Sequence, residues 1–307
     1  MERIPTILGP TASGKTSLAI KLARKINGEI IGLDSRQIYK DIPIGTAQPA
    51  LNEILKTPHH LIGIKSLSET VSAGQYAKMV KDAISTIKER KKIPIICGGS
   101  GLYFSAVSKG IFKKSVTDKK IRDQLTRRYE KGDAQSMLDE LTEIDPEYSK
   151  LVHVNNKKRL IRALEIIEST GKSPSLHFQD QKNNPQDLPD LYTIYLDWNK
   201  VDLKRRIKIR TSEMLANGWV DEVRNVLQKY PNKTLHPLDS IGFKEIISYL
   251  KDELLFEDLE NIISIKTNQF ARKQVKWFKK EKLDLIIPML IDYPLTNAID
   301  EIENNIN

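Results

Sequence analysis

The stretch Gly9-Pro10-Thr11-Ala12-Ser13-Gly14-Lys15-Thr16 matches the phosphate-binding pattern G-x-x-x-x-G-K-[ST] at every fixed position. Mostly apolar residues precede it in 4–8, and apolar residues recur at helical spacing in 18–26. The pattern therefore lies in the context that it requires, a turn between a buried strand and an amphipathic helix. It predicts a loop that binds the phosphates of a ligand.

Each fixed position of this loop has a chemical reason. Gly9 and Gly14 let the backbone turn tightly, so that successive N–H groups point at one anion at the positive end of a helix. Lys15 adds a positive charge, and the Thr16 hydroxyl is placed to hold a Mg²⁺ ion that bridges phosphate oxygens. The loop alone does not distinguish a nucleotide from a diphosphate on another organic group.

Two more predicted strands end near this loop. The apolar run 29–33 ends at Asp34, and the apolar run 93–97 ends in Gly98-Gly99-Ser100-Gly101. Ligands of open parallel sheets bind beyond the carboxyl ends of the strands, so Asp34 is expected to face the phosphate loop. The sequence therefore predicts an α/β fold with a parallel sheet core like that of P-loop NTPases.

The pattern changes in the middle of the chain. Residues 113–190 show long helical periodicity, high charge and no convincing strand, and their polar, proline-containing end at 179–190 is expected to be a linker. A strand at 192–196 resumes the core pattern, and the last helix is expected at 262–278. We predict two domains, a P-loop catalytic core of residues 1–112 and 191–307 and a helical, basic insertion of residues 113–190.

Charge indicates the kind of partner. The 307-residue chain carries a formal net charge of +9, and its excess of Lys and Arg gathers in four clusters, 113–131, 157–162, 204–210 and 272–280. A single basic run is common on a solvated helix face, but four clusters favour a polyanionic partner. The chain has no run of eighteen apolar residues and begins directly with a strand, so we expect a cytoplasmic protein without a membrane anchor.

Cysteine and histidine give no metal pattern. The single cysteine, Cys97, lies in an apolar run and is expected to be a buried structural thiol. His59 and His60 have no Cys or carboxylate at ligand spacing and are expected to be hydrogen-bonded structural residues, before a candidate short strand at 61–64.

Motifs along nearly the whole chain resemble those of bacterial tRNA dimethylallyltransferases, also called tRNA isopentenyltransferases or IPP transferases. Besides the phosphate loop, the matching stretches are Asp34-Ser35 with Gln37 and Tyr39, Ile44-Gly45-Thr46-Ala47 with Pro49, Pro58-His59-His60-Leu61, Gly98-Gly99-Ser100-Gly101-Leu102-Tyr103, Arg159-Leu160 with Arg162-Ala163-Leu164-Glu165, Ile241-Gly242-Phe243-Lys244-Glu245, and Ala271-Arg272-Lys273-Gln274 with Trp277. The resemblance implies transfer of a dimethylallyl group from dimethylallyl diphosphate to N6 of adenosine 37 of tRNA, next to the anticodon, with release of diphosphate.

The residues agree with that chemistry. The exocyclic nitrogen of adenine is a poor nucleophile, so a base must remove its proton, and Asp34 is the candidate. Loop amides, Lys15 and Mg²⁺ held at Thr16 would neutralise the departing diphosphate. We expect a monomer. The resemblance also implies contacts with the anticodon stem-loop of tRNA from Asp34, Ser35, Arg36, Gln37, Ser100, Arg122, Lys158, Arg159, Leu160, Ile161 and Arg162.

Three features depart from the family pattern. Ser100 stands where the family usually has Thr, and Asn268 precedes Gln269 where the family usually has Arg. The C-terminal zinc finger of eukaryotic members is absent, as a single cysteine requires.

Three alternatives use the same residues. An adenylate isopentenyltransferase would alkylate a free nucleotide, and a P-loop small-molecule kinase would bind ATP and use Asp34 to activate a hydroxyl. Neither would need four basic clusters or an insertion of this size. A non-catalytic RNA-binding protein with a vestigial loop is disfavoured because Lys15, Thr16 and Asp34 are all present.

Overall fold

The computed structural model describes residues 3–111, 118–183, 187–290 and 293–306. The chain divides into two compact units, Met1–Ser108 with Pro189–Asn307, and Lys109–Leu188. The domain boundary predicted at 112/113, with Lys113 and Lys114 of the first basic cluster and Pro185 of the predicted linker, lies outside the described residues.

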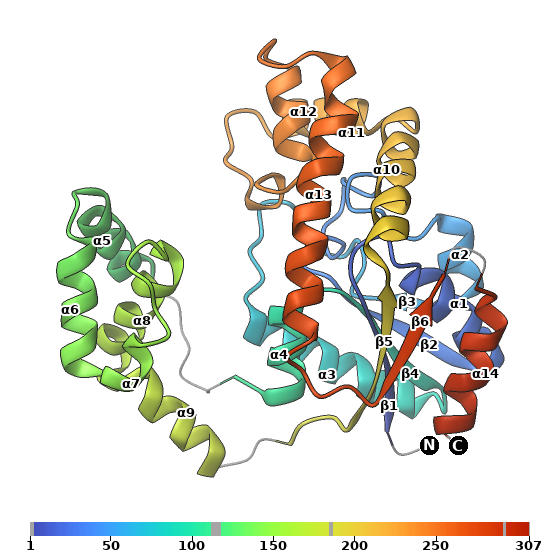
Figure 1. The fold of residues 1–307 in the computed structure, drawn as a ribbon, viewed down its shortest axis with the longest axis horizontal. Helices are drawn as coiled ribbons and strands as arrows, with labels where there is room; N and C mark the ends of the chain where they lie inside the picture. Colours follow the sequence, from blue (N-terminus) through green and yellow to red (C-terminus); the bar gives the residue numbers. More distant parts are fainter. Residues whose placement is uncertain (1–2, 112–117, 184–186, 291–292, 307) are drawn as a thin grey trace. The chain divides into compact units, whose positions relative to one another are not determined.

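The first unit is built on a parallel sheet, which has six strands in the described part of the chain, in the order β3-β2-β4-β1-β5-β6 (Figure 1). The strands are β1 Ile4–Leu8, β2 Gly28–Leu33, β3 His59–His60, β4 Ile93–Gly98, β5 Leu191–Trp198 and β6 Leu285–Met289. Strand β1 pairs on one side with β4 and on the other with β5, so Thr6 lies opposite both Ile96 and Thr193. The predicted parallel α/β core is confirmed.

Helices cover both faces of the sheet. One apolar core packs β-strand residues against α3, α4, α11, α12 and α13, and the other packs them against α1, α10 and α14. These two cores explain the buried, nearly continuous apolar strands that parallel sheets require. The helices of this unit are α1 Lys15–Lys25, α2 Leu51–Lys56, α3 Ala73–Glu89, α4 Gly101–Lys109, α10 Lys200–Ala216, α11 Trp219–Lys229, α12 Phe243–Tyr249, α13 Phe256–Phe278 and α14 Leu295–Ile306, with a 3₁₀ turn at His236–Leu238.

Three predicted elements were wrong. The short strand is His59–His60 rather than 61–64, because Leu61 takes a positive φ of 62° and turns the chain out of the sheet. The predicted linker at 179–190 begins as helix, since α9, Pro174–Asn183, extends into it. Helix α13 is not the last one, because β6 and α14 follow it. Pro288 argues against a strand in the sequence, because proline has no N–H to donate to a neighbouring strand. It is tolerated here because β6 is an edge strand.

The second unit is helical in its described residues. Its helices are α5 Lys119–Glu130, α6 Ala134–Ile144, α7 Pro146–Ser149, α8 Lys157–Thr170 and α9 Pro174–Asn183. Leu125, Met137, Leu141, Leu160 and Leu164 form the centre of its core, each at most 1% exposed. The helical periodicity predicted for this part of the chain is confirmed in its described residues.

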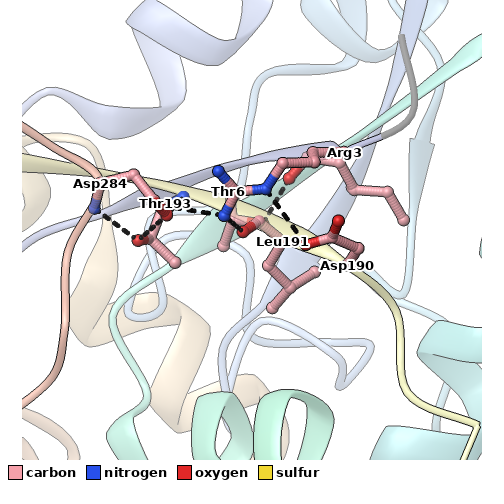
Figure 2. A network of polar contacts seen from close by, with 7 residues as sticks. Arg3, Thr6, Asp190, Leu191, Thr193 and Asp284 are labelled. Atoms are coloured by element: carbon pink, nitrogen blue, oxygen red, sulfur yellow. Dashed lines mark hydrogen bonds and ion pairs between the residues drawn. The ribbon is translucent and has the colours of Figure 1, made fainter.

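A polar network ties the sheet together where the chain re-enters the first unit (Figure 2). Arg3, just before β1, donates to Asp190 Oδ1 at 3.1 Å, to the Leu191 carbonyl at 2.6 Å and to Asp284 Oδ1 at 3.0 Å. Asp284 Oδ2 accepts from the backbone N–H of Thr193 at 2.8 Å and from its hydroxyl at 2.7 Å. One arginine therefore joins the start of β1 to β5 and to the segment that leads into β6.

Candidate active site

The carboxyl ends of β1, β2 and β4 meet at a cavity of about 990 Å³ within the first unit. Helices α10 and α13 also supply many of its lining residues. Most of the site residues that the sequence predicts in this unit line the cavity. They are Thr11, Ala12, Lys15, Thr16, Asp34, Ser35, Arg36, Gln37 and Ser100.

The phosphate loop has the shape that an anion site needs. Ala12 and Gly14 take left-handed φ values of 62° and 84°, and Gly14 caps the N-terminus of α1. The indole Nε1 of Trp198 donates to the Ser13 carbonyl at 2.9 Å. A C=O and the next N–H point in opposite directions across a trans peptide plane. The N–H of Gly14 therefore points away from Trp198, to the side on which an anion can bind.

Lys15 lies inside the loop. Its ammonium donates to the Pro10 carbonyl at 2.6 Å and to Ser13 Oγ at 3.4 Å. The pKa of Lys15 is lowered from its ordinary value to about 8, mainly by burial and in part by nearby Arg210, while Cys97 and Asp34 act to raise it. A bound anion would supply the partner charge that this buried ammonium needs.

Two arginines of α10 also face the loop. Arg206 Nε donates to the Ala12 carbonyl at 2.8 Å, with its guanidinium 4.5 Å from the ring centre of Trp198. Arg210 Nη1 donates to Thr11 Oγ1 at 3.3 Å, and burial lowers the pKa of both arginines. The sequence predicts both only as members of a basic cluster, without a role at the loop. Their spacing of four on one helix was the available signal, since such residues share a face.

Asp34 sits at the end of β2, where its carboxylate is held by a turn. Its Oδ1 accepts from the N–H groups of Arg36 at 2.7 Å and Gln37 at 3.3 Å. The buried hydroxyl of Tyr76 donates to the Gly32 carbonyl at 2.6 Å and accepts from the Asp34 N–H at 3.4 Å. Among the described residues no hydrogen bond reaches Oδ2, so one oxygen is oriented by the turn and the other can accept a proton.

The model of the IPP transferase family matches residues 37–281 of the chain. The chain belongs to the IPP transferase family. A tRNA dimethylallyltransferase of Salinibacter ruber is 36% identical over 280 residues, which cover 91% of this chain and 86% of that protein. A tRNA dimethylallyltransferase of Thermotoga neapolitana is 39% identical over 274 residues, which cover 89% and 88%.

Solved structures of two relatives match this chain over nearly its whole length. A tRNA isopentenylpyrophosphate transferase of Bacillus halodurans aligns with a TM-score of 0.72 at 32% identity, covering 100% of this chain and 96% of that one. A eukaryotic dimethylallyltransferase, described as acting on tRNA, aligns with a TM-score of 0.82 at 30% identity, covering 99% and 80%. The P-loop-like core of this IPP transferase is therefore the fold of its family.

The loop that follows Asp34 is fixed by amide and carboxylate side chains. Gln37 Nε2 donates to the carbonyls of Thr46 at 3.1 Å and Ala47 at 2.8 Å. Glu222 of α11 accepts from the N–H groups of Ile44 at 2.7 Å and Gly45 at 2.8 Å. The part of the cavity wall formed by residues 45–47 is thus held by hydrogen bonds from Gln37 and from α11.

The remaining predicted site residues of this IPP transferase lie in the second unit. The side chains of Leu160 and Ile161 are buried in its core, at 0% and 6% exposure, so they are not available at its surface. Lys158 and Arg159 are exposed. Arg122 and Arg162 each form an ion pair with the fully buried Glu165, at 2.8 Å.

Thr16 and its surroundings fit a metal held mainly by phosphates. Within the described residues, no group of three or more His, Cys, Asp and Glu could hold a metal ion. Thr16 lies in the first turn of α1 and lines the cavity. Mg²⁺ commonly takes one or two protein oxygens together with substrate phosphates and water, and this donor set fits that pattern.

The predicted structural roles of Cys97 and the two histidines are confirmed. Burial raises the pKa of the Cys97 thiol to about 11, and the nearby Lys15 charge lowers it. His59 Nδ1 lies 2.6 Å from the Thr57 carbonyl, and His60 Nε2 lies 2.7 Å from the carboxylate of Glu29.

None of the described helices of this IPP transferase is long and apolar enough to cross a membrane.

Proposed function

We propose that this IPP transferase moves a dimethylallyl group from dimethylallyl diphosphate to N6 of adenosine 37 in the anticodon stem-loop of tRNA. The observation that carries the proposal is that the phosphate loop and the Asp34 carboxylate line one cavity. The relatives named tRNA dimethylallyltransferase, which match about nine-tenths of the chain, support the same reaction.

The donor would bind by its diphosphate. The N–H groups at the start of α1 with Lys15, Arg206 and Arg210 form a cationic pocket around the loop. Thr16 would hold Mg²⁺, which when bound supplies further positive charge to the phosphate oxygens. These charges stabilise the diphosphate as the carbon–oxygen bond to the allylic carbon breaks.

The acceptor would be activated by Asp34. The N6 nitrogen forms a bond to C1 of the dimethylallyl group while diphosphate leaves with the electron pair of the broken bond. The proton lost from N6 goes to Asp34 Oδ2, the carboxylate oxygen that the turn leaves unused. The target base must first leave the anticodon stack, as it does in other enzymes that modify bases.

The remaining contacts with tRNA would come from both units. Ser35, Arg36, Gln37 and Ser100 line the cavity that the base enters. In the second unit, the exposed Lys158 and Arg159 would contact phosphates together with Arg122 and Arg162. We propose that the protein works as a monomer in the cytoplasm, where its tRNA substrate is found.

A transfer assay tests this function. Purified protein receives labelled dimethylallyl diphosphate and Mg²⁺, with unmodified tRNA in one reaction and AMP in another. We expect label in tRNA, lost when adenosine 37 is replaced by guanosine. Label in AMP alone would favour the free-nucleotide enzyme. Label in neither, with phosphoryl transfer from ATP to a small molecule, would favour the kinase.

A further inference from the structure

The side chain of Gln274, on α13, joins two turns of the active site. Its Oε1 accepts from the N–H of Thr11 in the phosphate loop at 2.8 Å. Its Nε2 donates to the Gly99 carbonyl, in the turn after β4, at 2.8 Å. The two turns follow different strands, so one amide group fixes their separation.

Gln274 and Lys15 form hydrogen bonds with the same peptide group, the one between Pro10 and Thr11. The N–H of Thr11 and the carbonyl of Pro10 belong to the same trans peptide and point in opposite directions. On the far side of that peptide, the Pro10 carbonyl accepts from Lys15 Nζ at 2.6 Å. The orientation that Gln274 gives to this peptide therefore sets the position of the hydrogen bond that holds the ammonium.

The packing around this amide leaves little freedom. A Cβ added at Gly99 would lie 2.7 Å from Gln274 Nε2, 2.8 Å from the Gly9 carbonyl and 3.6 Å from Lys15 Nζ. A Cβ at Gly101 would lie 2.5 Å from the indole of Trp277, also on α13. Helix α13 thus contacts the turn closely at two glycines.

We propose that Gln274 is a positioning residue that orients the Pro10–Thr11 peptide, and through it Lys15, toward the departing diphosphate. The catalytic part of this inference rests on the function proposed above, whereas its binding part concerns diphosphate alone. Because the N–H of Thr11 is occupied by Gln274, it is not available to phosphate, which leaves other amides of the loop together with Lys15, Arg206 and Arg210. Only a side chain that both accepts and donates at this length satisfies the two turns.

The test is a double-mutant cycle between Gln274 and Lys15, read as the Kd of inorganic diphosphate in the presence of Mg²⁺. Gln274→Met keeps the length of the side chain and removes both hydrogen bonds. It should weaken diphosphate binding roughly tenfold in the wild-type background, because the Pro10–Thr11 peptide, and with it Lys15 Nζ, is no longer held in place. The N–H and C=O left without this partner are only partly buried, so water can pair with them. In a Lys15→Met background the same change should weaken it less than about twofold, because the group that Gln274 positions is gone.

Kinetics separate positioning from general stability. Gln274→Met should raise the KM for dimethylallyl diphosphate and lower kcat roughly 10²-fold, the typical effect of misplacing a reacting group. The Kd for tRNA and the Tm should stay close to wild type. Gln269→Met, an exposed glutamine on the same helix, is the matched control and should change none of these quantities.

Several outcomes would overturn the proposal. Equal losses of diphosphate affinity in both Lys15 backgrounds would mean that Gln274 does not act through Lys15. Parallel losses of Tm, tRNA binding and diphosphate binding would make the residue merely structural. If Gln274→Met does not fold, Gln274→Asn, one methylene too short to span both turns, must show the same cycle. Diphosphate binding remains a valid test even if the protein does not modify tRNA.

Discussion

At the scale of single residues, the proposed reaction should depend most on the Asp34 carboxylate. Asp34→Asn keeps an acceptor for the N–H groups of Arg36 and Gln37, so the turn should survive. The amide cannot take a proton from N6, and we expect turnover to fall by about 10² or more, the usual worth of a general base. Single-turnover rates and tRNA affinity measure the effect. Unchanged turnover would remove Asp34 from the mechanism.

Lys15 gives the active site a dependence on pH. Its pKa of about 8 means that the ammonium loses its proton above that pH in the ligand-free protein. We expect kcat/KM for the donor to fall about tenfold per pH unit above that point, as expected for one ionisation. Lys15→Met should be slow and flat over the same range, whereas Lys21→Met, an exposed lysine of α1, should keep the wild-type profile. A wild-type profile that stays flat to pH 10 would contradict this assignment.

The lowered pKa of Lys15 also makes the free energy of unfolding depend on pH. Between pH 8 and the ordinary value of 10.5, the unfolded chain holds the Lys15 proton and the folded protein does not. The contribution of Lys15 to the free energy of unfolding therefore rises with pH across this window. The buried charge that weakens the empty protein is the one that a diphosphate would satisfy.

At the scale of elements, the loop at 43–48 depends on a helix far away in the sequence. Glu222 of α11 holds the N–H groups of Ile44 and Gly45, and Gly45 packs where a Cβ would lie 2.1 Å from Trp219 Nε1. Glu222→Ala should cost roughly 1 to 3 kcal/mol for each N–H left unpaired, measured by urea unfolding. Glu222→Gln, which retains one good acceptor, should lose less. An unchanged midpoint for the alanine variant would refute this role.

The elements also show which parts of the site a sequence can reveal. The phosphate loop and Asp34 were predictable because a strand, a turn and a helix start lie in a few consecutive residues. The spacing of Arg206 and Arg210 predicts a shared helix face, but their role and that of Gln274 depend on which faces of α10 and α13 pack against residues 9–16. A glutamine on a helix has no local signature, and its two partners are 263 and 175 residues away.

At the scale of the whole molecule, tRNA binding should depend on salt through the second unit. Removing the exposed charge in Lys158→Ala should reduce the slope of log Kd against log salt by roughly one unit for each lost phosphate contact. Lys150→Ala, an exposed lysine of the same unit outside the basic clusters, should leave the slope unchanged. An unaltered slope for Lys158→Ala would place that lysine on a merely solvated face.

The fold could be predicted from the sequence wherever a strand is recognisable from its own residues. The runs around β1, β2, β4 and β5 are short, apolar and bounded by turns, and the helical middle of the chain stands out by its charge. Strand β6 was missed because it is a five-residue edge strand with Pro288, and its pairing with β5 depends on residues some ninety positions away. The burial of Leu160 and Ile161, which the family resemblance placed at the tRNA, follows from packing that no motif records.

The pairing of β1 with both β4 and β5 has a consequence for synthesis on the ribosome. After β4 has been translated, one edge of β1 has no strand beside it until β5 emerges some ninety residues later. At a translation rate of about 5–20 residues per second, that edge of β1 stays unpaired for roughly 5 to 20 s. During this interval the second unit, Lys109–Leu188, is made in full. The order of translation thus leaves an unfinished sheet, a template for unwanted strand addition, exposed while the second unit is completed.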